Sequence, residues 1–506
     1  MPVTILRTRD GVLDAADGPA FDELRARLAS GPRKVLVHLH GGLVSQRSGE
    51  AIAATLSATG ERSYQASNDY EQVYVVWRTG AFETIRTNWQ DLFQNDRLYR
   101  ALLKKLIGYV SSKVDVVDGG GRSVGLAAAL SNAEIERRLR SGGDAPFADL
   151  DLAAGEPGGR AVVGGETSDD VVRTEFAVAL QQSGEFTGAV EDLGAAIGWD
   201  VEGRAVAADH GDPVRGRQSL ARLRPGVRAE LEGAPNSEEG RGLIASAALL
   251  KALVRHGVAI AVRVAGRLRS GRGHGVHATI DEELLRELYG DLVGASVWGM
   301  MKKDAYDHFE DGNLGARLVE ALSTQSHSLV VVGHSAGSIW ASALMARAAR
   351  QRGFPTFALV LLAPAVRMTE FAAALGAGSG LLRAFRVFAM SDELERLDAV
   401  LGHGTGPIYP SSLLYLVSGL FEETGGKAAP DAPLLGMQRF LGRDPGWLGN
   451  AAEEDAVRAV RLHAAGIADS AVYAKASGGP GLSTGATSHG GFDDDTTTLA
   501  SVHSLL

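Results

Sequence analysis

The segment from Ser328 to Arg350 constrains the fold of this chain more than any other. It begins with a β-branched apolar run at residues 329–332, which is typical of a buried strand. The run passes through the sequence Gly-His-Ser-Ala-Gly at residues 333–337 and enters a segment rich in Ala, Leu and Met, which favours helix. A strand and a helix joined at Gly-x-Ser-x-Gly predict a sharp turn that exposes the hydroxyl of Ser335 at the top of a sheet.

The two glycines of this turn have a steric reason. The strand and the helix approach each other closely on either side of Ser335, so side chains at Gly333 and Gly337 would have no room. The serine oxygen then lies at the positive end of a helix, where a developing negative charge is stabilised. Ser335 is therefore the predicted nucleophile. The alternative is an ordinary turn with an incidental serine, because so short a pattern arises by chance in a glycine-rich chain.

The bulk composition limits the classes of protein to consider. A chain of 506 residues can bury a large core and suggests more than one structural unit. Its 51 basic and 61 acidic residues give a net charge of −10, which disfavours a general nucleic-acid role. The chain has no cysteine, which excludes disulfides, thiolate metal sites and a cysteine nucleophile.

Two segments bear on whether to expect a signal peptide or a membrane span. The first ten residues contain Arg7, Arg9 and Asp10 and no apolar run, so no signal peptide is expected. The nearest approach to a membrane span is residues 243–264, and that segment contains Lys251, Arg255, His256 and Arg263. We therefore expect no transmembrane segment and a cytoplasmic protein.

A second informative segment runs from Lys34 to Leu43. It reads as a buried strand that leads into His40-Gly41-Gly42. A His-Gly-Gly loop lets the backbone approach a substrate carbonyl without an intervening side chain and supplies an N–H group to an oxyanion hole. Gly41 and Gly42 are the predicted donors from this loop, together with the N–H of Ala336 after the nucleophile. An ordinary glycine turn is the alternative.

Other early segments place further candidates beside these loops. Residues 3–6 could form a first edge strand, residues 21–28 a helix, residues 73–77 a strand and residues 82–93 an amphipathic helix. Arg78 follows the 73–77 strand and is a candidate anchor for an anionic substrate group, with a structural ion pair as the alternative. The remaining candidate substrate-binding residues flank the predicted nucleophile and oxyanion hole: His40, Leu43 and His334.

The middle of the chain has a different character. From about residue 111 to residue 240 glycine clusters recur and periodicity is weak, which predicts an inserted cap that is partly mobile. Residues 243–268 return to a strong helical pattern. That helix either packs in a core, which is the preferred interpretation, or serves as a lid or interfacial segment. The predicted division is a first core part at 1–110, a Gly-rich cap at 111–270 and a second core part at 271–506.

No metal or cofactor is expected. His274 and His277 are three positions apart, but the glycines around them predict a loop. No carboxylate follows in the spacing of a zinc-protease helix. The triple glycine at residues 119–121 is not a phosphate loop, because no Gly-Lys-Ser/Thr follows it.

The carboxylate partner of the nucleophile is expected after a late strand. Residues 357–364 and 384–390 read as buried strands, and Asp392 comes directly after the second. Its role would be to hold a histidine tautomer and stabilise the imidazolium. Asp392 could instead cap the following helix, and other carboxylates crowd the same stretch: Glu393, Glu395 and Asp398.

The predicted general base is His489. Residues 411–423 follow helical spacing, so residues 471–476 are the last predicted strand. His489 lies in a glycine-rich loop between that strand and a predicted helix at residues 496–506. Three other histidines also follow Asp392 but lie in helix-like context or too close to the acid: His403, His463 and His503.

With these motifs in this order, the chain resembles the α/β-hydrolase superfamily. The resemblance covers roughly Met1 to Leu106 and Ile280 to Leu506 and does not include the insertion. It implies an α/β fold with a mostly parallel, doubly wound sheet and a serine hydrolase that cleaves a carboxylic ester of a small or lipid-like molecule. Interfacial membrane contact is compatible with such a substrate. Thioesterase, amidase or acyltransferase chemistry on the same triad is the alternative, as is a catalytically silent scaffold.

Overall fold

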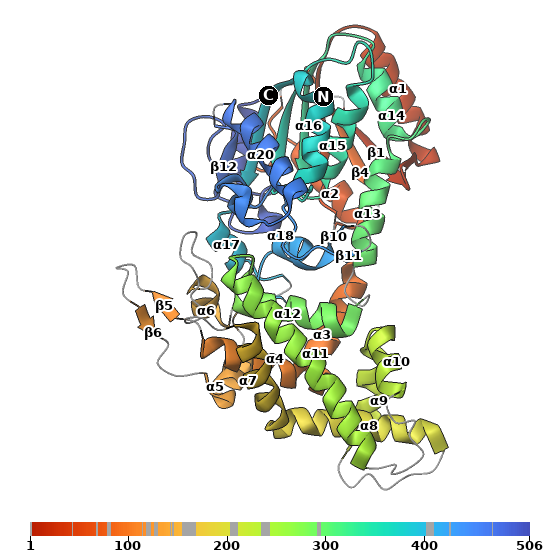
Figure 1. The fold of residues 1–506 in the computed structure, drawn as a ribbon. Helices are drawn as coiled ribbons and strands as arrows, with labels where there is room; N and C mark the ends of the chain where they lie inside the picture. The colour runs from red at the N-terminus through yellow and green to blue at the C-terminus, as the bar shows by residue number, and fades with distance from the viewer. Residues whose placement is uncertain are drawn as a thin grey trace. The chain divides into compact units, whose positions relative to one another are not determined.

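The computed structural model describes residues 3–42, 44–66, 69–77, 82–113, 115–117, 123–125, 130–141, 143, 146–153, 168–202, 211–233, 243–290, 295–400, 409–424, 427–467 and 469–506. The chain forms two compact units (Figure 1). Unit 1 consists of residues 1–82, 296–398 and 432–506, and unit 2 of residues 83–295 and 399–431. The predicted cap at 111–270 thus lies within a larger unit, which also takes a separate segment from late in the chain.

Unit 1 is built on an eight-stranded sheet in the order β12-β9-β8-β7-β3-β4-β1-β2. Every pair in it is parallel except β1 with β2, so this unit has an α/β fold with a mostly parallel sheet. The strands are β1 (Val3–Arg9), β2 (Val12–Leu13), β3 (Lys34–Leu39), β4 (Tyr70–Trp77), β7 (Ser328–His334), β8 (Phe357–Leu362), β9 (Leu382–Ala389) and β12 (Ala471–Tyr473).

The prediction that residues 3–6 form an edge strand is wrong in its position. Asp10 and Gly11 both adopt positive φ, 50° and 74°, and turn the chain back so that β2 pairs with β1. The two-residue strand β2 therefore forms the edge, and β1 lies between β2 and β4.

Helices cover both faces of this sheet. Apolar side chains of α2 and α21 share one core cluster with alternate residues of the strands, among them Leu36, Val330 and Val360. The intervening strand residues, such as Val35 and Val331, are also fully buried and point to the opposite face. On that face α1, α14, α15 and α16 lie side by side (Figure 1).

The helices of unit 1 follow the predicted periodicity closely. The sequence predicts helices at residues 21–28, 338–347 and 496–506, and the structure has a helix at each of these places. The longer helices are α1 (Gly18–Ala29), α2 (Gln46–Ser57), α13 (Ala295–Asp307), α14 (Leu314–Leu322), α15 (Gly337–Ala348), α16 (Met368–Gly378), α20 (Ala451–Ala465) and α21 (Thr496–His503), and the short ones are α17 (Asp392–Leu397) and α19 (Gln438–Leu441).

The order of the strands locates the place where a ligand would bind. The chain leaves β3 through α2 toward β4 on one side, and it leaves β7 through α15 toward β8 on the other. The two crossovers diverge, so a crevice is expected outside the carboxyl ends of β3 and β7. Leu39 pairs with Gly333, which brings the end of β3 level with the end of β7.

Unit 2 is mainly helical. The described part between residues 111 and 240 contains six helices, more regular structure than the weak periodicity predicted. Short apolar faces that pack on neighbouring helices account for this, as with Phe176, Leu180 and Leu193. The helices are α3 (Phe82–Asn95), α4 (Arg97–Ser111), α5 (Asn132–Ser141), α6 (Ala148–Ala153), α7 (Asp169–Gln181), α8 (Gly184–Glu202), α9 (Pro213–Arg222), α10 (Pro225–Gly233), α11 (Leu243–Arg269), α12 (Val276–Leu284) and α18 (Leu413–Leu416), with π-helical turns at Leu285–Tyr289 and Val417–Phe421.

Two small hairpins complete unit 2. They pair β5 (Asp115–Val117) with β6 (Ser123–Gly125) and β10 (Glu423–Thr424) with β11 (Lys427–Ala428).

The long helix α11 packs inside unit 2, as the preferred interpretation of residues 243–268 held. Its apolar side chains, including Leu253 and Ile260, are fully buried, and it lies against α7, α8 and α12. On its basic face Arg263 and Arg267 bind Glu283, at 2.8 Å and 3.1 Å. None of the described helices combines the length and the apolar character that a membrane-spanning segment needs.

Candidate functional site

Ser335 lies at a strained turn between β7 and α15. Its φ is +51°, in the left-handed region that a residue with a side chain rarely adopts. Hydrogen bonds hold this conformation from both sides of the residue. The Ser335 N–H donates to the carbonyl of Leu362 at 2.8 Å, and the Ser335 carbonyl accepts from Ala365 N–H at 3.1 Å and from the Ser338 hydroxyl at 2.6 Å.

The two glycines of the turn are required by close contact. A β-carbon built on Gly333 would lie 2.8 Å from the carbonyl oxygen of Gly337. A β-carbon built on Gly337 would lie 2.5 Å from the carbonyl oxygen of Leu39, at the end of the adjacent strand β3. The glycine pattern is therefore what lets β7, α15 and β3 converge at Ser335.

The ring of His489 faces the Ser335 hydroxyl. His489 Nε2 lies 2.9 Å from Ser335 Oγ, although the two residues are 154 positions apart. Burial, aided by the positive charge of His334 and opposed by Asp493, lowers the pKa of His489 to about 3. The ring is thus neutral at ordinary pH and able to accept the serine proton through Nε2.

The hydroxyl is less open than the sequence predicted. Ser335 is only 4% exposed and His489 only 6%. The reason is that the glycine loop after β3 also closes on the turn. A β-carbon built on Gly41 would lie 3.3 Å from Ser335 Cβ.

The structure does not bring Asp392 to the ring of His489. The Asp392 carboxylate forms an ion pair with Arg396 one turn along α17, and it lies 3.9 Å from Arg439 Nε. Among the described residues, His489 Nδ1 has no hydrogen-bond partner. Asp392 begins a helix, and the helical spacing directs its carboxylate to Arg396.

A different carboxylate contacts His489. Asp398 Oδ2 accepts a hydrogen bond from the backbone N–H of His489 at 2.7 Å. Burial raises the pKa of Asp398, and the hydrogen bond from His489 opposes that rise. Asp398 follows α17, where the chain leaves helical geometry with ψ of 76°, and this change of direction turns its side chain toward the His489 loop.

The His-Gly-Gly loop lies against the same turn. Besides the contact of Gly41 with Ser335, a β-carbon built on Gly42 would lie 2.7 Å from Ala336 Cβ and 3.2 Å from Met301 Cε. Gly41, Gly42 and Ala336 are therefore neighbours, as the sequence predicted. Ala336 is the N-cap residue of α15, where backbone N–H groups lack acceptors within the helix.

His40 has a different function from substrate contact. Its Nδ1 donates to the carbonyl oxygen of Gly41 at 2.7 Å, and its Nε2 accepts from the backbone N–H of Trp77 at 3.2 Å. Both ring nitrogens are used within the protein. Because the C=O of Gly41 and the N–H of Gly42 belong to one planar peptide, His40 fixes the direction of that N–H.

His334 is also occupied by protein partners. Its Nδ1 lies 3.1 Å from Asp493 Oδ2, and its Nε2 lies 3.0 Å from the carbonyl oxygen of His489. Neither ring nitrogen is left for a substrate. The predicted substrate-binding roles of His40 and His334 are therefore replaced by contacts that hold the two loops of the site. The other two candidates, Leu43 and Arg78, lie outside the described residues, as does His403.

His274 and His277 belong to unit 2 and are engaged separately. His274 Nδ1 lies 2.8 Å from Glu282 and its Nε2 lies 3.0 Å from Asp431. His277 is in α12 rather than in the predicted loop, and its ring packs edge-on against Phe147. Within the described residues, no cluster of three or more potential ligands is arranged to hold a metal ion.

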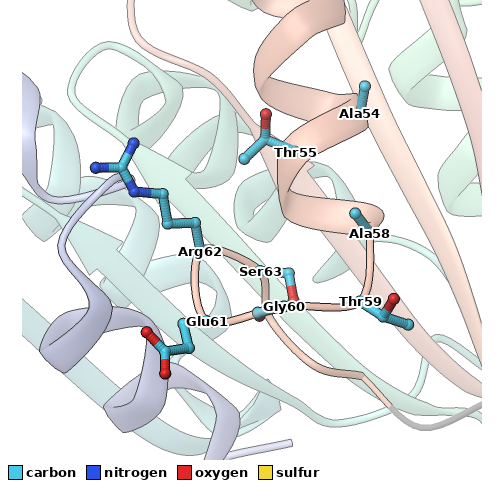
Figure 2. Close-up of a pocket in the computed structure, with 8 residues that line it drawn as sticks. All are labelled: Ala54, Thr55, Ala58, Thr59, Gly60, Glu61, Arg62 and Ser63. Atoms are coloured by element: carbon cyan, nitrogen blue, oxygen red, sulfur yellow. Dashed lines mark hydrogen bonds between the residues drawn. The ribbon is translucent and has the colours of Figure 1, made fainter.

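A surface hollow in unit 1 is separate from these residues. Figure 2 shows that it is lined by residues 54, 55 and 58–63, which follow one another at the end of α2. It contains none of the predicted site residues. Its one basic side chain, Arg62, forms an exposed ion pair with Asp494 at 3.2 Å.

Three residues of the site are not predicted by the sequence patterns. Asp398 is only one of several carboxylates that follow the strand. Because it lies several residues beyond the strand end, its position does not predict that its side chain points toward His489. Asp493 lies in a run of three aspartates, which reads as helix capping. Met301 lies in an amphipathic helix with no motif. One of the three could have been found from the sequence: Asp493 lies four residues after His489 across a glycine-rich turn, which indicates that the two residues lie close together.

The comparisons with known proteins supply no family. No family model matches the chain, and neither the curated proteins nor the solved structures contain a match.

We expect Gly337→Ala to destabilise the protein by about 1–3 kcal/mol, because the added methyl would overpack the contact with the backbone of Leu39. The matched control is Gly376→Ala in α16, where a β-carbon meets no atom within 4 Å. That change should stabilise the helix by about 0.5–1 kcal/mol. Urea unfolding measures both. Equal effects would mean that the turn at Ser335 can widen, contrary to the geometry described.

Proposed function

We propose that this protein is a serine hydrolase of the α/β-hydrolase type that cleaves carboxylic esters through an acyl-enzyme on Ser335. The observation that carries the proposal is the 2.9 Å contact between Ser335 Oγ and His489 Nε2 at a strained strand-to-helix turn. Strain at a single non-glycine residue is a feature of functional sites. The position at the carboxyl ends of β3 and β7 supports the same assignment.

The proposed reaction begins with the transfer of the Ser335 hydroxyl proton to His489 Nε2. The serine oxygen attacks the ester carbonyl carbon, and the tetrahedral intermediate collapses when His489 returns the proton to the departing alcohol. Water then attacks the acyl-enzyme and gives a proton to His489, which passes it to the departing Ser335 oxygen as the carboxylic acid is released. Burial keeps the His489 ring neutral, which is the protonation state that can accept the serine proton.

The oxyanion of the intermediate is proposed to bind two backbone N–H groups, those of Ala336 and Gly42. Ala336 lies at the N-terminus of α15, and Gly42 packs directly against it. The hydrogen bond from His40 Nδ1 to the Gly41 carbonyl pre-orients the second donor. A donor of this kind typically contributes about 3 kcal/mol of transition-state stabilisation.

Asp398 is the carboxylate that we assign to the triad. When Ser335 donates to Nε2, the His489 proton resides on Nδ1, and that nitrogen needs an acceptor. Asp398 already binds the backbone N–H of His489. A modest rotation of its side chain on substrate binding would let it accept from Nδ1 as well, because hydrogen bonds of catalytic groups often tighten only in complexes.

The side chain beside the proposed oxyanion hole points to the substrate class. Met301 covers Gly42 with its thioether and is 5% exposed. A flexible apolar side chain at this position favours an apolar acyl or alkyl group next to the ester carbonyl. An uncharged ester is therefore the proposed substrate.

Ser335→Ala should abolish both turnover of chromogenic esters and covalent labelling by a fluorophosphonate, because no other group supplies the attacking oxygen. The fold should remain intact by circular dichroism. The control is Ser342→Ala, which removes a buried hydroxyl from the same helix that bonds only to the helix backbone. Persistent labelling of the Ser335→Ala protein would refute the assignment.

The two candidate carboxylates are separated by a matched pair of substitutions. Asp398→Asn should lower kcat by about 10²- to 10⁴-fold, since the His489 tautomer loses its orienting charge. Asp392→Asn should retain turnover and instead lower stability by about 3 kcal/mol, because it breaks the buried ion pair with Arg396. Steady-state kinetics and urea unfolding distinguish the two. The reverse pattern would return the acid role to Asp392.

A further inference from the structure

The ring of His334 lies between two acceptors that belong to the loop of the proposed general base. Its Nε2 is 3.0 Å from the carbonyl oxygen of His489, and its Nδ1 is 3.1 Å from the carboxylate of Asp493. His334 itself immediately precedes Ser335 in the turn. One side chain therefore connects the residue before the nucleophile to two points of the loop that carries His489.

These contacts determine the protonation state of the ring. A carbonyl oxygen can only accept a hydrogen bond, so Nε2 must carry a proton. Burial raises the pKa of Asp493, but the positive charge of His334 and the hydrogen bond from its ring outweigh burial and lower that pKa to about 2. An ionised carboxylate also only accepts, so Nδ1 carries a proton as well. Both contacts therefore favour an imidazolium at His334, held by two charge-assisted hydrogen bonds.

We propose that His334 and Asp493 form a clamp, an ion pair that holds the His489 loop in position against Ser335. His334 is then a positioning residue of the proposed hydrolase, and this inference rests on that proposed function. The clamp acts through the backbone of His489 rather than on the reacting atoms. Its effect is to keep Nε2 of His489 at 2.9 Å from the serine oxygen.

The construction of the loop explains why a clamp is needed. His489 lies in a single 3₁₀ turn, His489–Gly491, and two glycines follow it. The two glycines give the backbone of such a segment more conformational freedom to lose on folding than other residues would. Both backbone groups of His489 are instead held by side chains from elsewhere. Asp398 accepts from its N–H at 2.7 Å, and His334 donates to its C=O at 3.0 Å.

Among the groups around His334, Asp493 is the charged group that raises its pKa. The neighbouring rings of His38, His40 and His489 are buried, which lowers their pKa values to about 3, 4 and 3. They are neutral when His334 is charged. Tyr64 bonds to His38, and burial raises its pKa, so it is also neutral. The adjacent ion pair of Arg62 with Asp494 is exposed and screened by water.

The clamp makes the site sensitive to pH on the alkaline side. Burial lowers the pKa of His334, but Asp493 and the His489 carbonyl outweigh burial and raise it above the usual 6.5. Because the pKa is raised, the clamp is complete below 6.5 and is lost as pH rises through the raised value. The loss of either proton would place a lone pair against an acceptor and release the loop.

The test compares Asp493→Asn with Asp494→Asn in the full-length protein. The first substitution removes the charge of the clamp, and the second removes a neighbouring carboxylate of the same loop. The rate of fluorophosphonate labelling of Ser335 is measured from about pH 5 to about pH 9. Wild-type and Asp494→Asn proteins should lose reactivity only at a midpoint above 6.5.

For Asp493→Asn the midpoint should move to lower pH, and the labelling rate at about pH 7.5 should fall by about 10- to 100-fold, since the His489 ring is no longer held in place. A merely structural role would lower the rate without moving the midpoint. An Asp493→Asn profile that superimposes on the wild-type profile would overturn the proposal, as would an equal shift in Asp494→Asn.

A second readout separates the clamp from the proposed function. The ring nitrogens of His334 are observed by NMR in protein with ¹⁵N-labelled histidine, with His334→Gln for assignment. We expect an imidazolium near pH 6.5 in the wild-type protein and a neutral ring in Asp493→Asn. A neutral His334 in the wild-type protein would refute the clamp. If wild-type Ser335 is not labelled at all, the hydrolase proposal fails and the NMR result still decides whether the clamp exists.

Discussion

The close approach of three backbones at Ser335 is the constraint on which the rest of unit 1 depends. A serine with φ of +51° persists only if its surroundings oppose relaxation. Here β7, α15 and the end of β3 meet with so little space that a methyl group on Gly337 would collide with the carbonyl of Leu39. The same contact brings the His-Gly-Gly loop to Ser335. The geometry of the candidate site thus depends on the packing of the sheet, and the burial of β3 and β7 offsets the strain at Ser335.

Four buried histidines lie in or beside the candidate site, and they differ in protonation state. Burial keeps His38, His40 and His489 neutral, whereas the ion pair with Asp493 favours the charged form of His334. The difference in protonation state follows from the groups that each ring contacts and not from the extent of burial, since all four rings are buried. Each neutral ring has a backbone or hydroxyl neighbour, and the charged ring alone faces a carboxylate. The neutral ring of His489 and the ring of His334, whose charged form is favoured, therefore lie with their centres 5.7 Å apart.

Much of unit 1 could be predicted from the sequence because its signals are local. Apolar runs identified β3, β4, β7, β8 and β9, and glycine spacing identified both loops of the site. The directions in which individual side chains point could not be predicted. Nothing in the stretch from Asp392 to Asp398 distinguishes a carboxylate that pairs along its own helix from one that leaves the helix end toward His489. The short helices of unit 2 are buried by neighbouring helices, and their own sequences show little helical periodicity. The sequence therefore predicts irregular structure where these helices lie.

The interleaving of the two units has a consequence for how the protein is made. Arg33 and His327, at the adjoining ends of β3 and β7, are 294 positions apart and yet hydrogen-bonded. Until β7 is synthesised, β3 exposes an unpaired edge in the middle of the future sheet, and such edges promote mispairing. Unit 2 is itself incomplete until residue 431. Neither unit can be completed on the ribosome before most of the other has been synthesised, so we expect the chain to fold slowly and late in synthesis.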